Sequence, residues 1–146
     1  GTTAVDVNHV YGCTDGVSTY FEHETGLNQV KEGAITAITA SIESGDFDIG
    51  QQGLAGDGEF MMKIRRVIPD FLSQTGDAVI TLNLRDFPNE TQASSSLGPF
   101  TVTSGTKKID TRARARSISL KVANTSTSQF WRLGTFRLDI QPDGRR

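Results

Sequence analysis

Residues 78–85 read Ala-Val-Ile-Thr-Leu-Asn-Leu-Arg, and this stretch decides the fold class. Ile80, Leu82 and Leu84 occupy alternate positions, with valine, threonine and asparagine around and between them. Because successive side chains of a β-strand point to opposite faces of its sheet, the pattern predicts a strand with one buried face. Pro88 follows closely, and proline cannot continue a hydrogen-bonded ladder, so the strand is predicted to end before it.

The same reasoning predicts strands elsewhere in the chain. Residues 5–11 and 17–24 are expected to be strands on either side of a turn at 12–16. Residues 35–42 fit a helical face as well as a strand face, and their three β-branched isoleucines favour the strand. The alternation at 60–65 places Phe60, Met62 and Ile64 on one face, and Met61, Lys63 and Arg65 on the other. Loops are predicted over the glycine-rich residues 45–58 and the serine-containing residues 91–98.

The composition is typical of one folded domain. The chain has 146 residues, of which 36% are hydrophobic and 22% charged, and these values fit a globular domain near the commonest size. No apolar run approaches the ~20 residues that a membrane helix needs, so no membrane partner is expected. The opening Gly1-Thr-Thr-Ala-Val suggests a chain cut from a longer protein. We therefore predict a single all-β domain over residues 1–146, an antiparallel β-sandwich of about eight strands.

Charge is distributed unevenly along the chain. Residues from Thr106 to the end include ten Lys or Arg and three Asp, whereas the first sixty residues are mainly acidic. Within the basic part, Ile109 to Val122 is predicted to be one strand about 45 Å long, at ~3.3 Å per residue. Its even positions hold three arginines and then three apolar residues, namely Arg112, Arg114, Arg116, Ile118, Leu120 and Val122.

One buried face cannot hold three unpaired guanidinium groups, because burying each charge costs several kcal/mol. Either a bulge near Ser117 reverses the alternation, or the arginine half projects beyond the sandwich toward carboxylates or another subunit. We favour the second explanation. The last strand shows a similar change of parity between Leu133 and Phe136, and a bulge is predicted at Gly134 between them.

The C-terminal part of the chain resembles a known family. Residues 112–122 read Arg-Ala-Arg-Ala-Arg-Ser-Ile-Ser-Leu-Lys-Val, and residues 130–146 read Phe-Trp-Arg-Leu-Gly-Thr-Phe-Arg-Leu-Asp-Ile-Gln-Pro-Asp-Gly-Arg-Arg. Together with Ile68-Pro-Asp-Phe and Leu84-Arg-Asp-Phe-Pro upstream, they resemble the C-terminal domain of tail nozzle, or tail-tube stabilisation, proteins of short-tailed bacteriophages. The resemblance covers about Phe60 to Arg146, and it departs from the family at Ala113 and Ala115, where a glycine and a bulkier residue are common.

The resemblance implies a structural virion protein. Such a protein forms a hexameric tube below the portal and adaptor, and DNA passes through the tube at ejection. No enzymatic activity and no cofactor are expected. The residues expected to take part in assembly are all arginines, namely Arg112, Arg114, Arg116, Arg145 and Arg146. The arginines of the row are expected to pair with carboxylates, to lie on a solvated strand face, or to contact DNA phosphates.

Chemical sites are weakly indicated by the sequence. His9 and His23 are the only histidines, and no nucleophile elbow accompanies them. Cys13 has no cysteine partner and no basic neighbour that would stabilise a thiolate. Oxygen ligands of the type that calcium prefers occur in a glycine-rich stretch, where ordinary turn chemistry is the stronger interpretation. These weak metal candidates are Asp46, Asp48, Asp57 and Glu59.

The alternative function is a carbohydrate-binding or adhesin sandwich. In that case Trp131, Tyr20 or Tyr11 would present an aromatic ring to a sugar. The exposure of Trp131 separates the two hypotheses. A ring packed inside the domain favours the structural role, and a ring lying open in a groove favours glycan binding.

Overall fold

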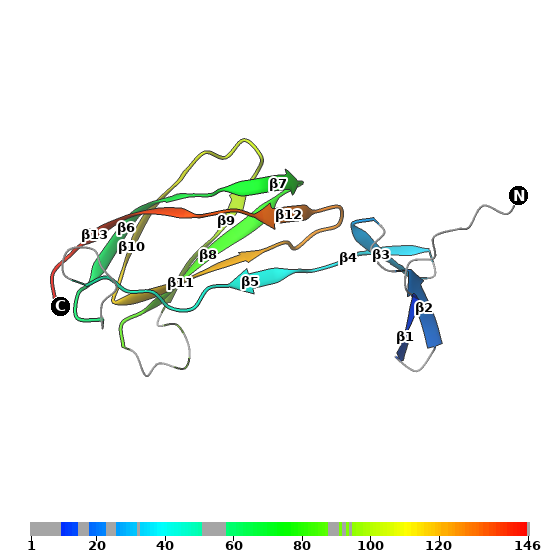
Figure 1. Cartoon of the computed structure of the whole chain (residues 1–146), viewed down its shortest axis with the longest axis horizontal. Coiled ribbons are helices and arrows are strands. Elements are labelled where there is room, and N and C mark those ends of the chain that lie inside the picture. The colour runs from blue at the N-terminus through cyan, green and yellow to red at the C-terminus, as the bar shows by residue number, and fades with distance from the viewer. Residues whose placement is uncertain are drawn as a thin grey trace, which may run out of the picture.

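Two antiparallel sheets enclose a common core in the part of the chain from Ser41 onward (Figure 1). The computed structural model describes residues 10–14, 18–22, 26–31, 33–50, 58–87, 91, 93 and 95–145. One sheet has the strand order β5-β11-β8-β9, and the other has the order β10-β6-β13. Strands β7 and β12 pair with each other and extend the β6–β13 pair beyond short breaks.

Nine strands of the sandwich lie in the described residues: β5 (Ser41–Glu43), β6 (Met62–Ile68), β7 (Phe71–Thr75), β8 (Ala78–Arg85), β9 (Ser95–Val102), β10 (Ile109–Ala115), β11 (Ser117–Ala123), β12 (Phe130–Leu133) and β13 (Arg137–Pro142). The described residues contain no helix, and consequently none that is long and apolar enough to cross a membrane. The predicted all-β antiparallel sandwich is confirmed.

Four strands before Ser41 belong to neither sheet of the sandwich. β1 (Val10–Thr14) pairs with β2 (Ser18–Glu22), and β3 (Asn28–Lys31) pairs with β4 (Ala34–Ala37). The predicted turn at 12–16 is wrong for residues 12–14, because β1 continues through them. That all 146 residues form one domain stays a prediction.

Asn124 holds the chain where it enters the sandwich. Its side-chain amide donates to the carbonyl of Ile38 at 2.8 Å, and its amide oxygen accepts the backbone N–H of Ala40 at 2.9 Å. The backbone N–H of Asn124 also donates to the Ala40 carbonyl at 3.1 Å. The Ile38 carbonyl and both backbone groups of Ala40 are therefore satisfied without a sheet partner. The strand predicted over 35–42 is confirmed with a break at residues 38–40.

The core is built from the inward faces of both sheets. Ile80, Leu82 and Leu84 of β8 are buried, as their alternation predicts, and the strand ends at Arg85. Met62 and Ile64 of β6 are also fully buried. The outward prediction for Met61 is wrong. Its side chain is buried because Met61 precedes β6 and its backbone pairs with Asp143 and Gly144, so it does not follow the strand alternation.

The predicted long strand from Ile109 to Val122 is two strands. β10 lies in the sheet with β6, and β11 lies in the sheet with β8, so the chain crosses from one sheet to the other at Arg116. Strands that switch sheets make the corners of such sandwiches. The alternation reverses at this corner: Ala113 and Ala115 are buried in β10, whereas Ile118 and Val122 are buried in β11.

The hypothesis that the arginine half projects beyond the sandwich is therefore wrong. Arg112 and Arg114 extend outward from a strand whose alanines pack in the core. Small side chains are needed there because β10 packs its inner face directly on the core between larger residues.

Gly134 marks the second change of parity, as predicted. The strand stops at Leu133 and resumes at Arg137, so the irregularity is a break of three residues rather than a single-residue bulge. The backbone N–H of Gly134 donates to the Asp70 carbonyl at 2.8 Å, and a Cβ on Gly134 would lie 2.8 Å from that carbonyl oxygen. Trp131 and Phe136 on either side are both half-buried against the core.

Candidate interaction surface

The outer face of the β10-β6-β13 sheet carries most of the predicted arginine row. Arg114 lies on this face and its Nε donates to the carboxylate of Asp143 at 2.5 Å. A second nitrogen of Arg114 donates to the backbone carbonyl of Asp143 at 3.2 Å. This arginine makes a charge-assisted contact with an aspartate of its own chain, and the contact ties the C-terminal residues to β10.

Arg116 makes contacts of another kind at the corner. Its guanidinium donates to the backbone carbonyls of Gly58 and Glu59, at 3.0 and 3.3 Å, and to that of Arg145 at 3.1 Å. The guanidinium of Arg145 lies over the ring of Phe60, 5.0 Å from its centroid. Both arginines therefore join chain segments at one end of the sandwich. Arg146 lies outside the described residues.

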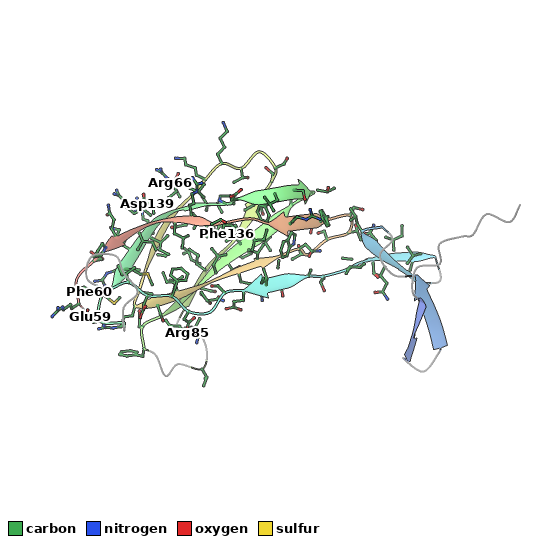
Figure 2. The ribbon with its side chains drawn as sticks, in the orientation of Figure 1. Glu59, Phe60, Arg66, Arg85, Phe136 and Asp139 are labelled. Carbon is green, nitrogen blue, oxygen red and sulfur yellow. The ribbon has the colours of Figure 1, made fainter. Side chains whose placement is uncertain are left out.

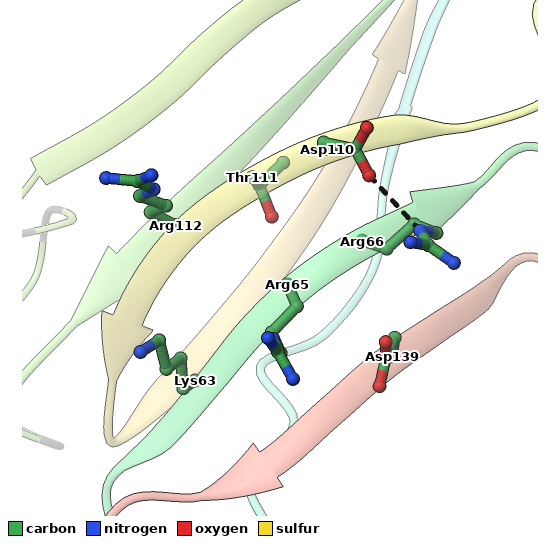
Figure 3. Close-up of a pocket in the computed structure, with 7 residues that line it drawn as sticks. All are labelled: Lys63, Arg65, Arg66, Asp110, Thr111, Arg112 and Asp139. Carbon is green, nitrogen blue, oxygen red and sulfur yellow. Dashed lines mark hydrogen bonds and ion pairs between the residues drawn. The ribbon is translucent and has the colours of Figure 1, made fainter.

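Arg112 borders an open depression on the same outer face (Figure 3). The depression has a volume of about 550 Å³. Its floor and rim come from the three strands of the sheet, and its lining includes the hydroxyl-bearing Thr111. The charged lining consists of four cations and two carboxylates, which are Lys63, Arg65, Arg66, Arg112, Asp110 and Asp139.

Irregular pairing shapes this depression. On the β10 side, Asp110 pairs with Arg66 and Ala113 with Ile64, so two residues of β10 lie opposite Arg65 alone. On the β13 side, Arg65 is an extra residue of β6 between two consecutive pairs. Bulges of this kind redirect side chains. On β6 the irregularity leaves the successive Arg65 and Arg66 both reaching the surface. Thr111 keeps the regular alternation of β10: it is buried, and its hydroxyl donates to the Ile64 carbonyl at 2.9 Å.

Asp110 neutralises one side of the depression. Its carboxylate pairs with Nε of Arg66 at 3.2 Å and with Nζ of Lys108 at 3.1 Å. Hydrogen bonds from Lys108 and Arg66 hold the pKa of the Asp110 carboxyl below its usual value. Figure 2 shows Arg66 and Asp139 on the outer side of the sandwich, and Phe136 within it.

Three cations of this surface were not identified as interaction residues from the sequence. Lys63, Arg65 and Arg66 are consecutive basic residues on β6, separated only by the buried Ile64. The alternation at 60–65 predicted the outward direction of Lys63 and Arg65, and that signal was available. Lys63, Arg65 and Arg66 lie on the same surface as Arg112 because β6 pairs with β10. No pattern in the sequence indicates that these two strands pair.

A second exposed surface is apolar and lies on the N-terminal strands. Val30, Ile35, Ile38 and Ile42 have exposed fractions of 58%, 63%, 52% and 50%. Val30 and Ile35 are cross-strand partners in the β3–β4 hairpin. Ile38 follows β4 in sequence, and Ile42 lies on β5, an edge strand of its sheet, opposite Val122 of β11. We call these four residues the apolar row.

The weak metal candidates do not form a group in the described part of the chain. Asp46 forms an ion pair with Arg85, with 3.0 Å between the carboxylate oxygen and Nε. Asp48 and Glu59 are described as well, and no three His, Cys, Asp or Glu side chains come together among the described residues. Asp57 lies outside that part. The contact of Asp46 with Arg85 fits a structural role for this loop.

The remaining candidates divide into those within and those outside the described residues. Trp131 is half-buried and packs edge-to-face on Phe71, with ring centroids 6.4 Å apart at 69°. Phe71 packs in turn on Phe136, at 5.9 Å and 85°. His9 and His23 lie outside the described residues, and so do the side chains of Tyr11, Cys13 and Tyr20.

Comparison with known proteins adds no relative. A scan against protein-family models and a search of curated proteins both found no match to this chain.

Proposed function

We propose that this chain is a non-enzymatic structural module that acts by assembly of copies, as part of the tail nozzle or tube of a short-tailed phage. In that role the copies form a ring below the portal and adaptor, and DNA crosses the ring at ejection. The observation that carries the assembly part is the apolar row on β3, β4 and β5. The phage part rests on the resemblance of residues 60–146 to tail nozzle proteins.

The apolar row supports assembly because its exposure is costly in water. Burial of apolar area contributes about 25 cal/mol per Å², so four large β-branched side chains left half exposed forgo a sizeable stabilisation. Single exposed apolar residues are normal, whereas a continuous row of them marks a protein–protein contact. Val30 and Ile35 are exposed cross-strand partners, and the exposed Ile38 and Ile42 follow them closely in sequence, so exposed apolar side chains are concentrated in this part of the chain.

The hairpin architecture supports the same proposal. An isolated two-stranded hairpin is marginally stable in water and needs a further strand or a packing surface. The β3–β4 hairpin has no third strand among the described residues. Its described tether to the sandwich is polar: the side-chain amide of Asn28 donates to Oγ of Ser128 at 3.1 Å, and the Ser128 N–H donates to Oδ1 of Asn28 at 2.5 Å. A neighbouring copy would supply the missing cover.

The aromatic cluster supports the structural proposal over the glycan-binding alternative. Trp131 packs its ring edge-to-face with Phe71. A sugar-binding aromatic ring needs an open face, and the described depression on this sandwich is lined by charged residues and a threonine.

Negative-stain electron microscopy of the full-length natural protein tests the proposal. We expect rings or short tubes, with a contact area of the obligate class above ~2,000 Å². The variant Ile35→Ser/Ile38→Ser is expected to abolish them and leave the sandwich folded. Leu72→Ser is the matched control, because Leu72 is an exposed apolar residue of β7, outside the row.

Two results would contradict the proposal. One is a protein that stays monomeric at every concentration and in the presence of its virion partners. The other is a ring that assembles equally well with Ile35 and Ile38 replaced by serine. Binding of a glycan that is lost in Trp131→Ala would favour the alternative function.

A further inference from the structure

The depression on the β10-β6-β13 sheet has an excess of positive charge that the chain does not neutralise. Asp110 is already shared by Arg66 and Lys108, at 3.2 and 3.1 Å. The side chains of Arg65, Arg112 and Lys63 form no hydrogen bond or ion pair within the described part of the chain. Figure 3 shows Lys63 and Arg112 on the part of the depression away from the Asp110–Arg66 pair, and Arg65 between Lys63 and Asp139.

The backbone of β6 and β10 fixes the positions from which Arg65 and Arg112 extend. Thr111 is buried and held by its hydrogen bond to the Ile64 carbonyl, and it precedes Arg112 directly in the bulge. Arg65 projects from the complementary irregularity of β6. Arg65 lies on the central strand of this sheet and Arg112 on an edge strand. A side chain on a paired strand loses less freedom on binding than one on a loop. The two guanidinium groups are therefore positioned in advance on one face.

We propose that Arg65, Arg112 and Lys63 form a binding site for a phosphate-type oxyanion. Arginine presents planar N–H forks that match the oxygens of phosphate, and lysine contributes a point charge. A volume of about 550 Å³ admits a free phosphate or pyrophosphate, and equally one phosphate of a nucleic-acid backbone. The site is independent of the proposed assembly, which uses the apolar row.

Asp139 limits the strength and selectivity of the site. It lies on β13 beside Arg66 in the register, and its carboxylate forms no hydrogen bond or ion pair among the described residues. A fixed carboxylate repels a bound anion, so the ligand is expected to sit toward Arg112 and Lys63. Neutralising Asp139 should therefore strengthen binding.

The test is an NMR titration of this chain with inorganic phosphate, with chloride adjusted to keep the ionic strength constant. We expect saturable shifts of the backbone amides around Arg65 and Arg112. Arg65→Ser/Arg112→Ser should weaken binding by ~tenfold or more, since charge-assisted hydrogen bonds are lost. Asp139→Asn should strengthen it by a few-fold. Arg137→Ser is the matched control, an exposed arginine of the same sheet outside the depression, and should leave it unchanged.

The same titration with pyrophosphate and with a short oligonucleotide of thymidines identifies the source. Tighter binding of the oligonucleotide with the same dependence on Arg65 and Arg112 assigns the site to a nucleic-acid backbone. Equal or weaker binding assigns it to the free ion. If the serine variant does not fold, Arg65→Lys/Arg112→Lys keeps the charge and removes the forks, and weaker binding is still expected.

Shifts that do not saturate, that chloride reproduces, or that persist in the serine variant would overturn the site. So would unchanged affinity in Asp139→Asn. In any of these cases the cations form a solvated face only. Because phosphate binding is read on this chain in solution and ring formation by microscopy, failure of one proposal is distinguishable from failure of the other.

Discussion

Isoleucine behaves in opposite ways in two regions of this molecule. Ile118 of β11 is fully buried between the sheets, whereas Ile35 of β4 is 63% exposed. Both lie in strands, and each is followed in sequence by a hydroxyl-bearing residue, Ser119 or Thr36. The difference is the layer opposite: β11 faces a second sheet, and the β3–β4 hairpin faces none that the described residues provide. The burial of an apolar strand residue is thus decided by the partner layer, and an uncovered strand indicates where a partner binds.

Truncating the two isoleucines should give the largest contrast. Ile118→Ala removes a fully buried side chain and is expected to lower the free energy of unfolding by about 2–5 kcal/mol. Ile35→Ala is expected to change it by less than ~0.5 kcal/mol in the unassembled chain. Urea denaturation followed by Trp131 fluorescence measures both. A similar loss for the two variants would break the comparison, since it would mean that Ile35 is covered within its own chain.

Asn124 separates the two regions, and its removal should have the next largest effect. Asn124→Ala leaves the Ala40 amide and the Ile38 carbonyl without their side-chain partner, at a cost of about 1–3 kcal/mol. Hydrogen exchange should show faster exchange of the Ala40 amide and a fraying β5. Asn124→Asp keeps the acceptor for Ala40 but places a buried carboxylate oxygen against the Ile38 carbonyl, so at neutral pH it should destabilise at least as much as alanine.

The stability that Glu43 contributes to the sandwich should depend on pH. Hydrogen bonds from Ser119 and then Asn83 hold the pKa of the Glu43 carboxyl below its usual value of 4.5. A carboxyl with a lowered pKa stabilises the folded state above the unfolded-state pKa, and this stabilisation is lost as pH falls through the folded value. The deficit of Glu43→Gln relative to the wild type should be largest near pH 7 and should shrink below about pH 4.5. A deficit that does not vary with pH would show that the charge of Glu43 is not involved.

The surface ion pair of Arg114 should give the smallest effect. Its contact with Asp143 is about half exposed on both sides, and exposed pairs contribute about 0.2–1 kcal/mol. Arg114→Ser should therefore lower the midpoint of thermal unfolding only slightly, and added salt should reduce the difference. A loss as large as that of Asn124→Ala would mean that the C-terminal residues contribute more to the sandwich than this pair suggests.

Part of the candidate surface could be predicted from the sequence. The sequence displayed the arginine row and the outward direction of Lys63 and Arg65. The depression could not be predicted from the sequence. It depends on two irregularities around Arg65, one in the pairing of β6 with β10 and one in the pairing of β6 with β13. β6 and β10 lie about fifty residues apart in the sequence, and no local sequence pattern indicates that they pair.

Local alternation by itself determined the strand character of 78–85 and the inward direction of Ile80, Leu82 and Leu84, because the two-residue period is a property of the extended backbone. It also located the change of parity at Gly134. The tertiary structure alone decided that the stretch from Ile109 to Val122 divides at Arg116 between two sheets. A strand joins the sheet whose edge offers hydrogen bonds and whose face offers cover, and both are supplied by residues far away in the chain.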